Sequence, residues 1–344
     1  MRVVISPDKF RGTLSAAEAA EAMAAGCRRA GVDDLSVLPL ADGGEGTLDV
    51  IAGTCGGSRR TVTVSGPLGD SVMAEWLLLP NGTAIVEAAS ACGRHLVGDA
   101  NDPLRASTRG VGELIAAVFA AGARRCIVGV GGTATTDGGL AAVEALGWSL
   151  AGREVTVACD VTHTFLAAAR VFAPQKGATP AQVQLLERRL VQLAAVYNDR
   201  LGVDLTLIEH AGAAGGLAGG LHAIGARLES GFDVVAGLVG LDEACDGADV
   251  VITGEGKCDA TSFEGKVVGG VCDVAAEHEV PVVAVVAGQI TAEARAVFAA
   301  SPAITGYALV DRVWQEGEAF ARAGTLVEEA TVEAVRNARD AVID

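Results

Sequence analysis

The loop at residues 6–13 combines one acidic and two basic side chains directly after a short run of β-branched residues. It reads Ser-Pro-Asp-Lys-Phe-Arg-Gly-Thr and carries Asp8, Lys9 and Arg11. The carboxylate can bind a metal ion or accept a proton, and the two cations can bind an anion. Because ligands of open α/β proteins sit at the carboxyl ends of strands, this loop is a candidate binding site. A solvated Asp–Lys pair is the alternative.

A second loop, residues 41–47, places acids around a pair of glycines and also follows a strand-like run. Gly43 and Gly44 let the backbone turn sharply and approach a ligand, and the helix expected next supplies free N–H groups. Asp42 and Glu45 add the hard oxygen ligands that Mg²⁺ prefers. This density of glycine and acid favours a functional loop over a simple turn capped by Asp42.

The third loop, residues 129–139, reads Gly-Val-Gly-Gly-Thr-Ala-Thr-Thr-Asp-Gly-Gly. Gly131, Gly132 and Thr133 offer backbone N–H groups and a hydroxyl, which can form a phosphate cradle, and Asp137 starts another Asp-Gly-Gly sequence. The segment also fits the Gly-x-Gly-x-x-Ala form of a dinucleotide fingerprint. An NAD(P)-dependent oxidoreductase is therefore an alternative. It is the weaker one, because that fingerprint normally opens the first β-α-β unit of a fold.

The fourth loop, residues 253–266, brings acids and lysines together after an apolar strand. Glu255 and Asp259 can orient a metal ion, and Lys266 can neutralise a phosphoryl group in transfer. Neither Lys257 nor Lys266 is followed by Ser or Thr, so the chain has no Walker A sequence. A P-loop kinase is excluded, but kinase chemistry is not.

Two weaker candidates lie between the third and fourth loops. Asp160 follows a strand-like run and is a candidate base or metal ligand. Lys176, in Pro-Gln-Lys-Gly-Ala-Thr before an expected helix, is a candidate anion contact. The glycine-rich segment at residues 212–220 either lines a ligand or permits close helix packing, and the sequence leaves both readings open.

These loops require an α/β scaffold, and short β-branched runs do alternate with alanine-rich helical patterns. Runs such as Val250–Ile252 and Val282–Val286 are apolar throughout, which is typical of strands buried on both faces of a parallel sheet. Strands are expected at residues 2–6, 35–40, 125–130, 250–253, 282–287 and 305–310, and helices at 15–30, 113–121 and 140–146.

Two stretches depart from this alternation and predict a second, inserted α/β domain. Residues 60–89 read as a three-stranded antiparallel meander, and residues 160–216 are irregular around one helix at about 180–197. The expected division is a Rossmann-like, mostly parallel core domain and the inserted domain. The core comprises residues 1–60, 104–148 and 228–344, and the inserted domain comprises 61–103 and 149–227.

Composition restricts the partners of the protein. The chain has 344 residues and a net charge of −17, which opposes binding to nucleic acid or to anionic membranes. Its eight cysteines form no Cys-x-x-Cys pair, and no apolar run has the length of a membrane span or a signal peptide. A cytoplasmic protein acting on small molecules is expected. The oligomeric state stays open, with a homodimer among the alternatives.

Taken in order, the motifs resemble those of the bacterial glycerate kinases, the type that is neither P-loop nor sugar-kinase-like. The resemblance covers most of the chain and rests on PDKFRGTLSA, LADGGEGT, SGPLGD, GVGGTATTDGG, FAPQKGAT, AGAAGGLAGG and ITGEGKCDATSFEGK. It implies two α/β domains with the active site in the cleft between them. It also implies Mg²⁺-dependent transfer of the γ-phosphoryl group of ATP to D-glycerate, usually at the 2-hydroxyl.

The resemblance places these residues in the family's motifs, and their roles in the reaction are a hypothesis. Metal binding falls to Asp42, Glu45 and Glu255, and proton acceptance to Asp160, with Asp8 as second choice. Charge neutralisation falls to Lys9, Arg11 and Lys266. Contacts with substrate or nucleotide are expected from Arg11, Gly43, Gly44, Gly131, Gly132, Thr133, Asp137, Lys176 and Asp259.

The chain also departs from the family pattern inside these loops. Family members usually carry Ser where this chain has Lys9, and Lys where it has Arg11. After Asp160 they continue into an Asn-Pro-Leu stretch, whereas this chain reads Thr-His-Thr-Phe at residues 162–165. A related small hydroxy acid as acceptor and 3-phosphoglycerate as product therefore stay open. A non-catalytic sensor of a hydroxy acid or nucleotide is a further alternative, and the acids and lysines at several strand ends argue against it.

Overall fold

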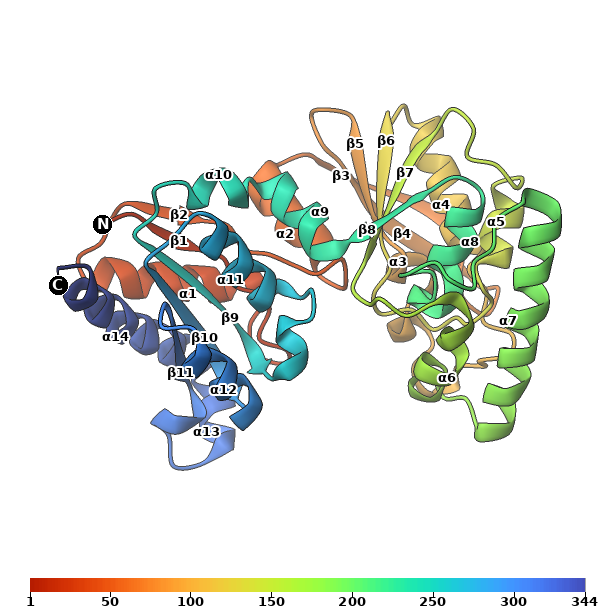
Figure 1. The fold of residues 1–344 in the computed structure, drawn as a ribbon. Coiled ribbons are helices and arrows are strands. Elements are labelled where there is room, and N and C mark those ends of the chain that lie inside the picture. The colour runs from red at the N-terminus through yellow and green to blue at the C-terminus, as the bar shows by residue number, and fades with distance from the viewer. Residues whose placement is uncertain (344) are drawn as a thin grey trace. The chain divides into compact units, whose positions relative to one another are not determined.

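The computed structural model describes residues 1–343, and this part of the chain divides into two compact units. The first unit comprises residues 1–41, 49–54 and Val235 to the end of the described chain; the second comprises residues 42–48 and 55–234. In Figure 1 the second unit is mainly orange, yellow and green, and the first unit contains the red start and the blue end of the chain. The chain therefore passes between the units four times.

The first unit is built on a five-stranded parallel sheet in the order β11-β10-β9-β1-β2 (Figure 1). Its strands are β1 (Val3–Ile5), β2 (Leu35–Val37), β9 (Val250–Cys258), β10 (Val282–Ile290) and β11 (Ile304–Ala308). Its helices are α1 (Ala16–Arg29), α10 (Leu241–Cys245), α11 (Val267–Glu277), α12 (Ala292–Ala300), α13 (Glu316–Ala321) and α14 (Ala323–Ile343). Two more helices, α2 (Thr47–Cys55) and α9 (Gly231–Val239), straddle the boundaries of the units.

Alternate residues of these strands pack against opposite faces of the sheet. Ile5 and Ile252 belong to the core formed with α1 and α14, while α11 packs on β9 and β10. Burial on both faces explains the uninterrupted apolar runs that predicted a parallel sheet. Helix α1 begins as expected, because the Ser15 hydroxyl accepts from the Glu18 N–H and the Glu18 carboxylate accepts from the Ser15 N–H.

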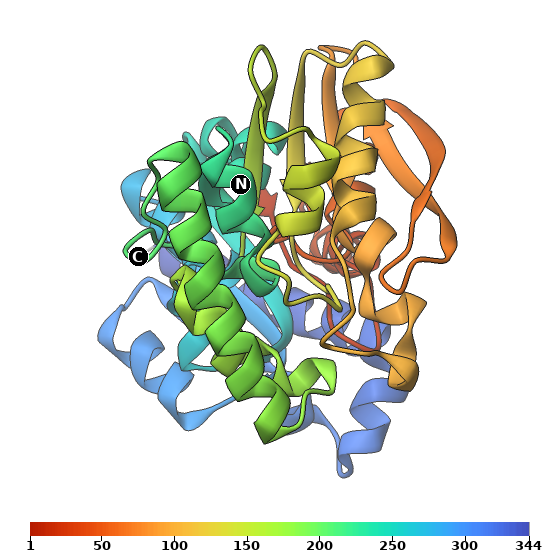
Figure 2. The same cartoon turned by 90° about the vertical axis from the view of Figure 1, so that its right-hand side faces the viewer.

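The second unit contains a six-stranded mixed sheet in the order β3-β4-β5-β6-β7-β8. Its strands are β3 (Ser58–Ser65), β4 (Ser71–Leu78), β5 (Thr83–Glu87), β6 (Arg125–Gly129), β7 (Glu154–Cys159) and β8 (Arg227–Ser230). Its helices are α3 (Ala89–Cys92), α4 (Arg109–Ala120), α5 (Leu140–Ala145), α6 (Ala168–Phe172), α7 (Pro180–Leu201) and α8 (Leu217–Ala223). The long helix α7 packs against α6 and α8 (Figure 2).

The predicted meander is confirmed, but four segments assigned to the core domain, residues 42–48, 55–60, 104–148 and 228–234, belong to the second unit. Strands β3, β4 and β5 pair antiparallel, as expected. Strand β6, however, pairs in parallel with β5 and β7, so residues 104–148 belong to the second unit and not to the core domain. A buried parallel strand has the same apolar pattern in either sheet, and only its pairing partners distinguish the two.

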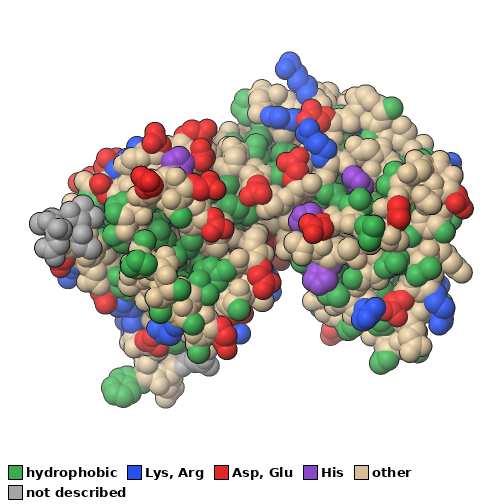
Figure 3. Space-filling view, viewed as in Figure 1, with side chains coloured by type: hydrophobic (Ala, Val, Ile, Leu, Met, Phe, Trp, Pro, Cys, Tyr) green, Lys and Arg blue, Asp and Glu red, His purple; other side chains and the backbone are tan. Residues whose placement is uncertain are grey.

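The acidic composition is visible on the surface. Figure 3 shows Asp and Glu side chains distributed over the face seen in Figure 1. In the described part of the chain, no helix is both long and apolar enough to cross a membrane.

Candidate functional site

In the first unit, the carboxyl ends of β1 and β9 place two acidic residues close together. The Ser6 N–H donates to the Ile252 carbonyl at 2.8 Å, and the Asp8 N–H donates to the Gly254 carbonyl, also at 2.8 Å. These bonds continue the pairing of β1 with β9 past the end of the shorter strand. Asp8 is consequently near enough to Glu255 for its charge to raise the pKa of that carboxyl.

Glu255 is the most perturbed acid in this unit. Burial raises its pKa to about 7; a hydrogen bond from Ser262 opposes this rise, and the charge of Asp8 adds to it. Its Oε1 atom is buried and has no hydrogen-bond partner among the residues that the structure describes. A carboxylate with an unused oxygen and a disfavoured charge is suited to binding a cation.

The loop after β9 positions Asp259 and Lys266 beside each other. Asp259 accepts from the Thr261 N–H at 3.0 Å and from the Thr261 hydroxyl at 2.7 Å, and the hydroxyl contact lowers the pKa of Asp259. Lys266 Nζ donates to the same hydroxyl oxygen at 2.9 Å. Thr261 therefore joins Asp259 and Lys266, two of the three charged residues predicted from the fourth loop.

Lys9 and Arg11 belong to the same end of the first unit. The Lys9 N–H donates to Asp8 Oδ1 at 2.7 Å, which fixes the direction of the Asp8 side chain. The backbone at Arg11 lies against β9, because a Cβ added to Gly256 would be 3.0 Å from the Arg11 nitrogen. All six residues predicted from the first and fourth loops thus come from neighbouring strand ends of one sheet.

In the second unit, the second and third loops pack backbone against backbone at the ends of β6 and β7. A Cβ added to Gly131 would lie 2.5 Å from the Gly44 Cα, and one added to Gly43 would lie 2.7 Å from the Ala158 carbonyl oxygen. These glycines therefore serve close packing of the two loops.

Glu87, at the end of β5, was missed by the sequence reasoning and holds the second loop in place. Its Oε1 accepts from the Gly46 N–H at 3.1 Å and from the Leu48 N–H at 2.9 Å, at the start of α2. An acid at a helix N-terminus also interacts favourably with the helix dipole. The sequence did contain a signal for this role, an acidic residue at the end of a strand-like run. That run was interpreted only as part of the meander.

The packing of the second loop predicts a large difference between two glycine-to-alanine substitutions. Gly43 and Gly46 both have positive φ, +84° and +95°, but only Gly43 is crowded, since nothing lies within 4 Å of a Cβ on Gly46. Gly46→Ala should cost about 1 kcal/mol for the backbone conformation. Gly43→Ala should cost roughly 2 kcal/mol more because of the clash with Ala158. Urea unfolding of both variants measures this difference, and equal losses would contradict the packing argument.

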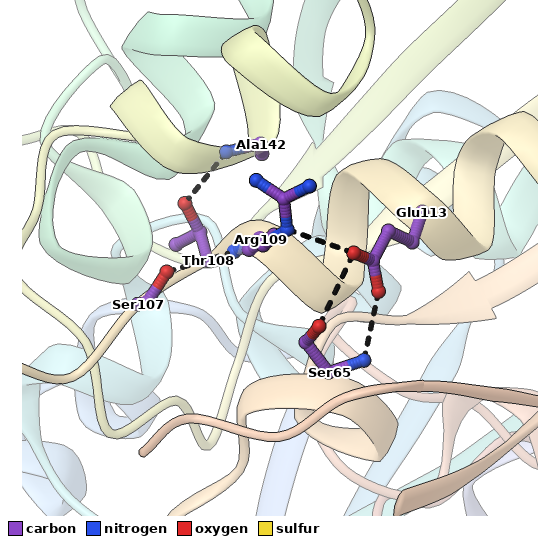
Figure 4. Close-up of polar contacts among 6 residues, drawn as sticks. All are labelled: Ser65, Ser107, Thr108, Arg109, Glu113 and Ala142. Atoms are coloured by element: carbon purple, nitrogen blue, oxygen red, sulfur yellow. Dashed lines mark hydrogen bonds and ion pairs between the residues drawn. The ribbon is translucent and has the colours of Figure 1, made fainter. Parts of the chain in front are cut away.

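Asp137 makes structural contacts at the start of two helices. It accepts from the Thr108 N–H and hydroxyl, both at 2.8 Å, and from the Gly139 N–H at 3.1 Å. Burial raises the pKa of Asp137, although these hydrogen bonds oppose the rise. The Thr108 hydroxyl oxygen also accepts from the Ala142 N–H at the start of α5 (Figure 4). The expected substrate contact of Asp137 is not tested by these bonds, which indicate a positioning role.

Hydrogen bonds also connect the start of α4 to the end of β3. Glu113 accepts from the N–H and the hydroxyl of Ser65, at 2.8 and 3.1 Å, and from Arg109 Nε at 2.9 Å (Figure 4). The turn that follows Ser65 carries the Ser-Gly-Pro-Leu-Gly-Asp sequence. That family motif therefore has a visible structural function in the second unit.

Lys176 is buried, with 6% of its surface exposed. Its Nζ donates to the Thr135 carbonyl oxygen at 2.6 Å and to the Thr133 hydroxyl oxygen at 3.3 Å. Burial lowers the pKa of Lys176 to about 8, and the nearby Asp137 and Asp160 oppose that change. Asp160, just after β7, thus lies close to Lys176 and to the third loop.

The glycine-rich segment at residues 212–220 serves packing. A Cβ on Gly215 would be 2.1 Å from the Thr135 carbonyl oxygen, and one on Gly219 would be 2.6 Å from the Phe165 ring. Of the two readings left open by the sequence, the structure therefore supports close packing.

The predicted residues form two groups, one on each unit. The first unit carries Asp8, Lys9, Arg11, Glu255, Asp259 and Lys266, and the second carries Asp42, Gly43, Gly44, Glu45, Gly131, Gly132, Thr133, Asp137, Asp160 and Lys176. Across residues 1–343, no set of three or more His, Cys, Asp or Glu side chains could hold a metal ion. The two neighbouring carboxylates of Glu255 and Asp8 still fit Mg²⁺, because this ion commonly uses one or two carboxylates together with substrate phosphates.

Acids, lysines and glycine-rich loops at the strand ends of an α/β fold are what a phosphotransferase needs, and comparison with known proteins identifies the family. The model of the glycerate kinase family matches residues 3–154 and 148–339. The chain is 39% identical over 328 residues to glycerate 2-kinase of Escherichia coli (strain K12), covering 85% of this chain and 86% of that protein. It is 38% identical over 335 residues to glycerate kinase of Bacillus subtilis (strain 168), covering 87% of each.

The structural comparison agrees with the sequence comparison. A crystal structure assigned as glycerate kinase 2 from Salmonella typhimurium LT2 matches with a TM-score of 0.81 and 33% identity, covering 99% of this chain and 98% of the other. The chain belongs to the glycerate kinase family, and it is an ATP-dependent kinase. The family resemblance read from the seven motifs is confirmed, and the oxidoreductase and sensor alternatives are not supported.

Proposed function

We propose that this kinase transfers the γ-phosphoryl group of ATP to the 2-hydroxyl of D-glycerate and forms 2-phosphoglycerate. The relatives described above are named as glycerate kinases, and one as a glycerate 2-kinase. The observation that carries the proposal is Glu255, a carboxylate with an unused oxygen beside Asp8 at the joint end of β1 and β9. A phosphoryl-transfer site needs carboxylates of this kind to hold a metal.

Mg²⁺ would be held by Glu255, with Asp8 as the neighbouring carboxylate. When bound, the ion supplies charge neutralisation for the phosphate groups of ATP. Asp42 and Glu45, on the second unit, remain predicted ligands. Lys9, Arg11 and Lys266 are the proposed cations for the glycerate carboxylate and the transferring group, because all three come from the loops around Asp8 and Asp259.

Asp160 is the proposed acceptor of the proton from the substrate hydroxyl. Asp8, the second choice for the base, is assigned to the metal site instead, because it lies near Glu255. Thr133, with the backbone at Gly131 and Gly132, is the proposed phosphate contact. The Thr133 hydroxyl oxygen accepts from Lys176, so its own proton can be donated to a ligand oxygen.

A related small hydroxy acid is the second candidate acceptor. The loop at residues 162–165 differs from the family pattern, and it places the His163 ring edge-to-face against Phe172, with ring centroids 5.3 Å apart. This loop follows Asp160 directly, so its change bears on the acceptor and on whether the product is a 2- or a 3-phosphate.

We place the enzyme in the cytoplasm, because all eight cysteines are free thiols in the structure.

³¹P NMR of the product formed from Mg·ATP and D-glycerate tests the proposed function. We expect ADP and a new phosphomonoester signal, and its coupling to the carbinol proton separates 2-phosphoglycerate from 3-phosphoglycerate. A panel of related hydroxy acids run in parallel measures selectivity, with EDTA as the metal-free control. ADP formation with another hydroxy acid alone would favour the second candidate. No ADP with any acceptor would overturn the kinase proposal.

A further inference from the structure

Lys176 is a charged side chain at a buried position where an apolar side chain would be more favourable for stability. Removing an ammonium group from water is unfavourable unless protein groups replace its hydrogen bonds to water. Lys176 ends the short 3₁₀ turn η4 (Pro174–Lys176) and is buried beneath the third loop. The residue therefore needs an explanation other than the stability of the unit.

In the described part of the chain, both side-chain hydrogen bonds of Lys176 go to one segment of that loop. Nζ donates to the Thr135 carbonyl and to the Thr133 hydroxyl, at 2.6 and 3.3 Å. A second link joins the same two segments, since Asn101 Nδ2 donates to the Ala134 carbonyl at 3.1 Å and to the Lys176 carbonyl at 2.8 Å. The turn and the loop are thus cross-linked by two side chains, and only one of them carries a charge.

The flanks of the loop are held by neutral groups. The Arg94 N–H donates to the Gly132 carbonyl at 2.9 Å, and the Gly138 N–H donates to the Gly215 carbonyl at 3.0 Å. The Thr136 hydroxyl, by contrast, is buried and has no hydrogen-bond partner in the part of the chain that the structure describes. The loop backbone is therefore fixed by the protein, while not all of its hydroxyl groups are used by it.

The hydrogen bond from Lys176 determines the direction of the Thr133 hydroxyl. An ammonium group only donates, so Thr133 Oγ1 must be the acceptor, and its own hydrogen must point away from Nζ. We propose that Lys176 is a positioning residue, which orients the Thr133 hydroxyl as a donor to a phosphate oxygen of ATP and does not contact the nucleotide itself. This proposal rests on the proposed function, in which the loop at Gly131–Thr133 binds the nucleotide.

A double-mutant cycle on ATP binding tests the proposal. Lys176→Met keeps the length of the side chain but removes the charge, and Thr133→Val keeps the shape but removes the hydroxyl. Each should weaken ATP binding by about ten- to a hundredfold in equilibrium titration, the usual loss for a charge-assisted hydrogen bond. If Lys176 acts through Thr133, the double variant should bind ATP no more weakly than Thr133→Val alone.

Other results would overturn the proposal. Additive losses would mean that Lys176 contacts the nucleotide directly, and unchanged affinity in Lys176→Met, with only an altered urea midpoint, would mean a merely structural role. Arg170→Met is the matched control, because it removes an exposed positive charge from the neighbouring helix α6, and it should bind ATP like the wild type.

Two measurements keep the test decisive. If Lys176→Met does not fold, Thr133→Ser should still bind ATP normally while Thr133→Val does not, and equal affinities for the two would contradict the proposed donor. ATP titration needs no acceptor substrate. A wild-type protein that binds ATP but phosphorylates nothing would therefore overturn the proposed function and leave the role of Lys176 measurable.

Discussion

Replacing Glu255 with glutamine should lower kcat/KM by about a hundredfold or more and, at the same time, stabilise the metal-free protein at neutral and alkaline pH. The loss of activity follows from removing the charge that is proposed to hold Mg²⁺. The gain in stability follows from removing a carboxylate whose charged form is disfavoured by burial. Steady-state kinetics with excess Mg²⁺ and urea unfolding in EDTA measure the two effects on the same preparation.

The dependence of this stability gain on pH follows from the direction of the pKa shift. The pKa of Glu255 is about 7 in the folded protein, compared with the ordinary value of 4.5. Between these values the folded state holds a proton that the unfolded state has released, so wild-type stability falls as pH rises. The gain of Glu255→Gln should therefore be absent below pH 4.5 and complete above pH 7, where it is on the order of 3 kcal/mol.

Glu264→Gln is the matched control for this experiment. Glu264 is an exposed acid in the same loop, so its replacement removes an equal charge without relieving a buried one. It should resemble the wild type in both measurements. Normal activity in Glu255→Gln would remove Glu255 from the proposed metal site, and a stability gain that did not vary with pH would contradict the role of burial.

Asp160→Asn should reduce kcat by about a hundred- to ten-thousandfold, the usual loss when a general base is removed. The Michaelis constant for ATP should change little, because the amide keeps the size of the side chain. Asp8→Asn should behave differently, since Asp8 lies beside Glu255 and is proposed to assist the metal. Its loss should appear as a higher requirement for Mg²⁺.

A titration of activity against Mg²⁺ separates these two roles. Excess Mg²⁺ should restore much of the activity of Asp8→Asn and none of the activity of Asp160→Asn. If Asp160→Asn keeps near-normal kcat, the assignment of the base is wrong. If both variants lose kcat and neither responds to Mg²⁺, the metal role proposed for Asp8 is wrong.

Local features of the fold were predictable because local chemistry determines them. The start of α1 follows from the Ser15–Glu18 capping box, and the parallel strands follow from apolar runs that are buried on both faces. The antiparallel meander was indicated by its short turns. Each of these signals lies within a few residues of the element that it predicts.

Features that depend on distant partners were not predictable from the sequence. Whether β6 joins one sheet or the other depends on its pairing with β5 and β7. The burial of Lys176 depends on a loop some forty residues earlier, as its bonds to Thr133 and Thr135 show. Glu87 could be recognised as a loop anchor only once α2 was seen to begin beside it.

The long-range pairing of β1 has a consequence for how the protein is made. Val3 pairs with Val250, so β1 leaves the ribosome long before β9, its neighbour in the centre of the sheet. Strands β3 to β8 are all synthesised within that interval, so the second unit can complete its sheet first. Two strands joined in parallel are not stable alone, so β1, β2 and the apolar face of α1 lack most of their packing partners until the last third of the chain emerges.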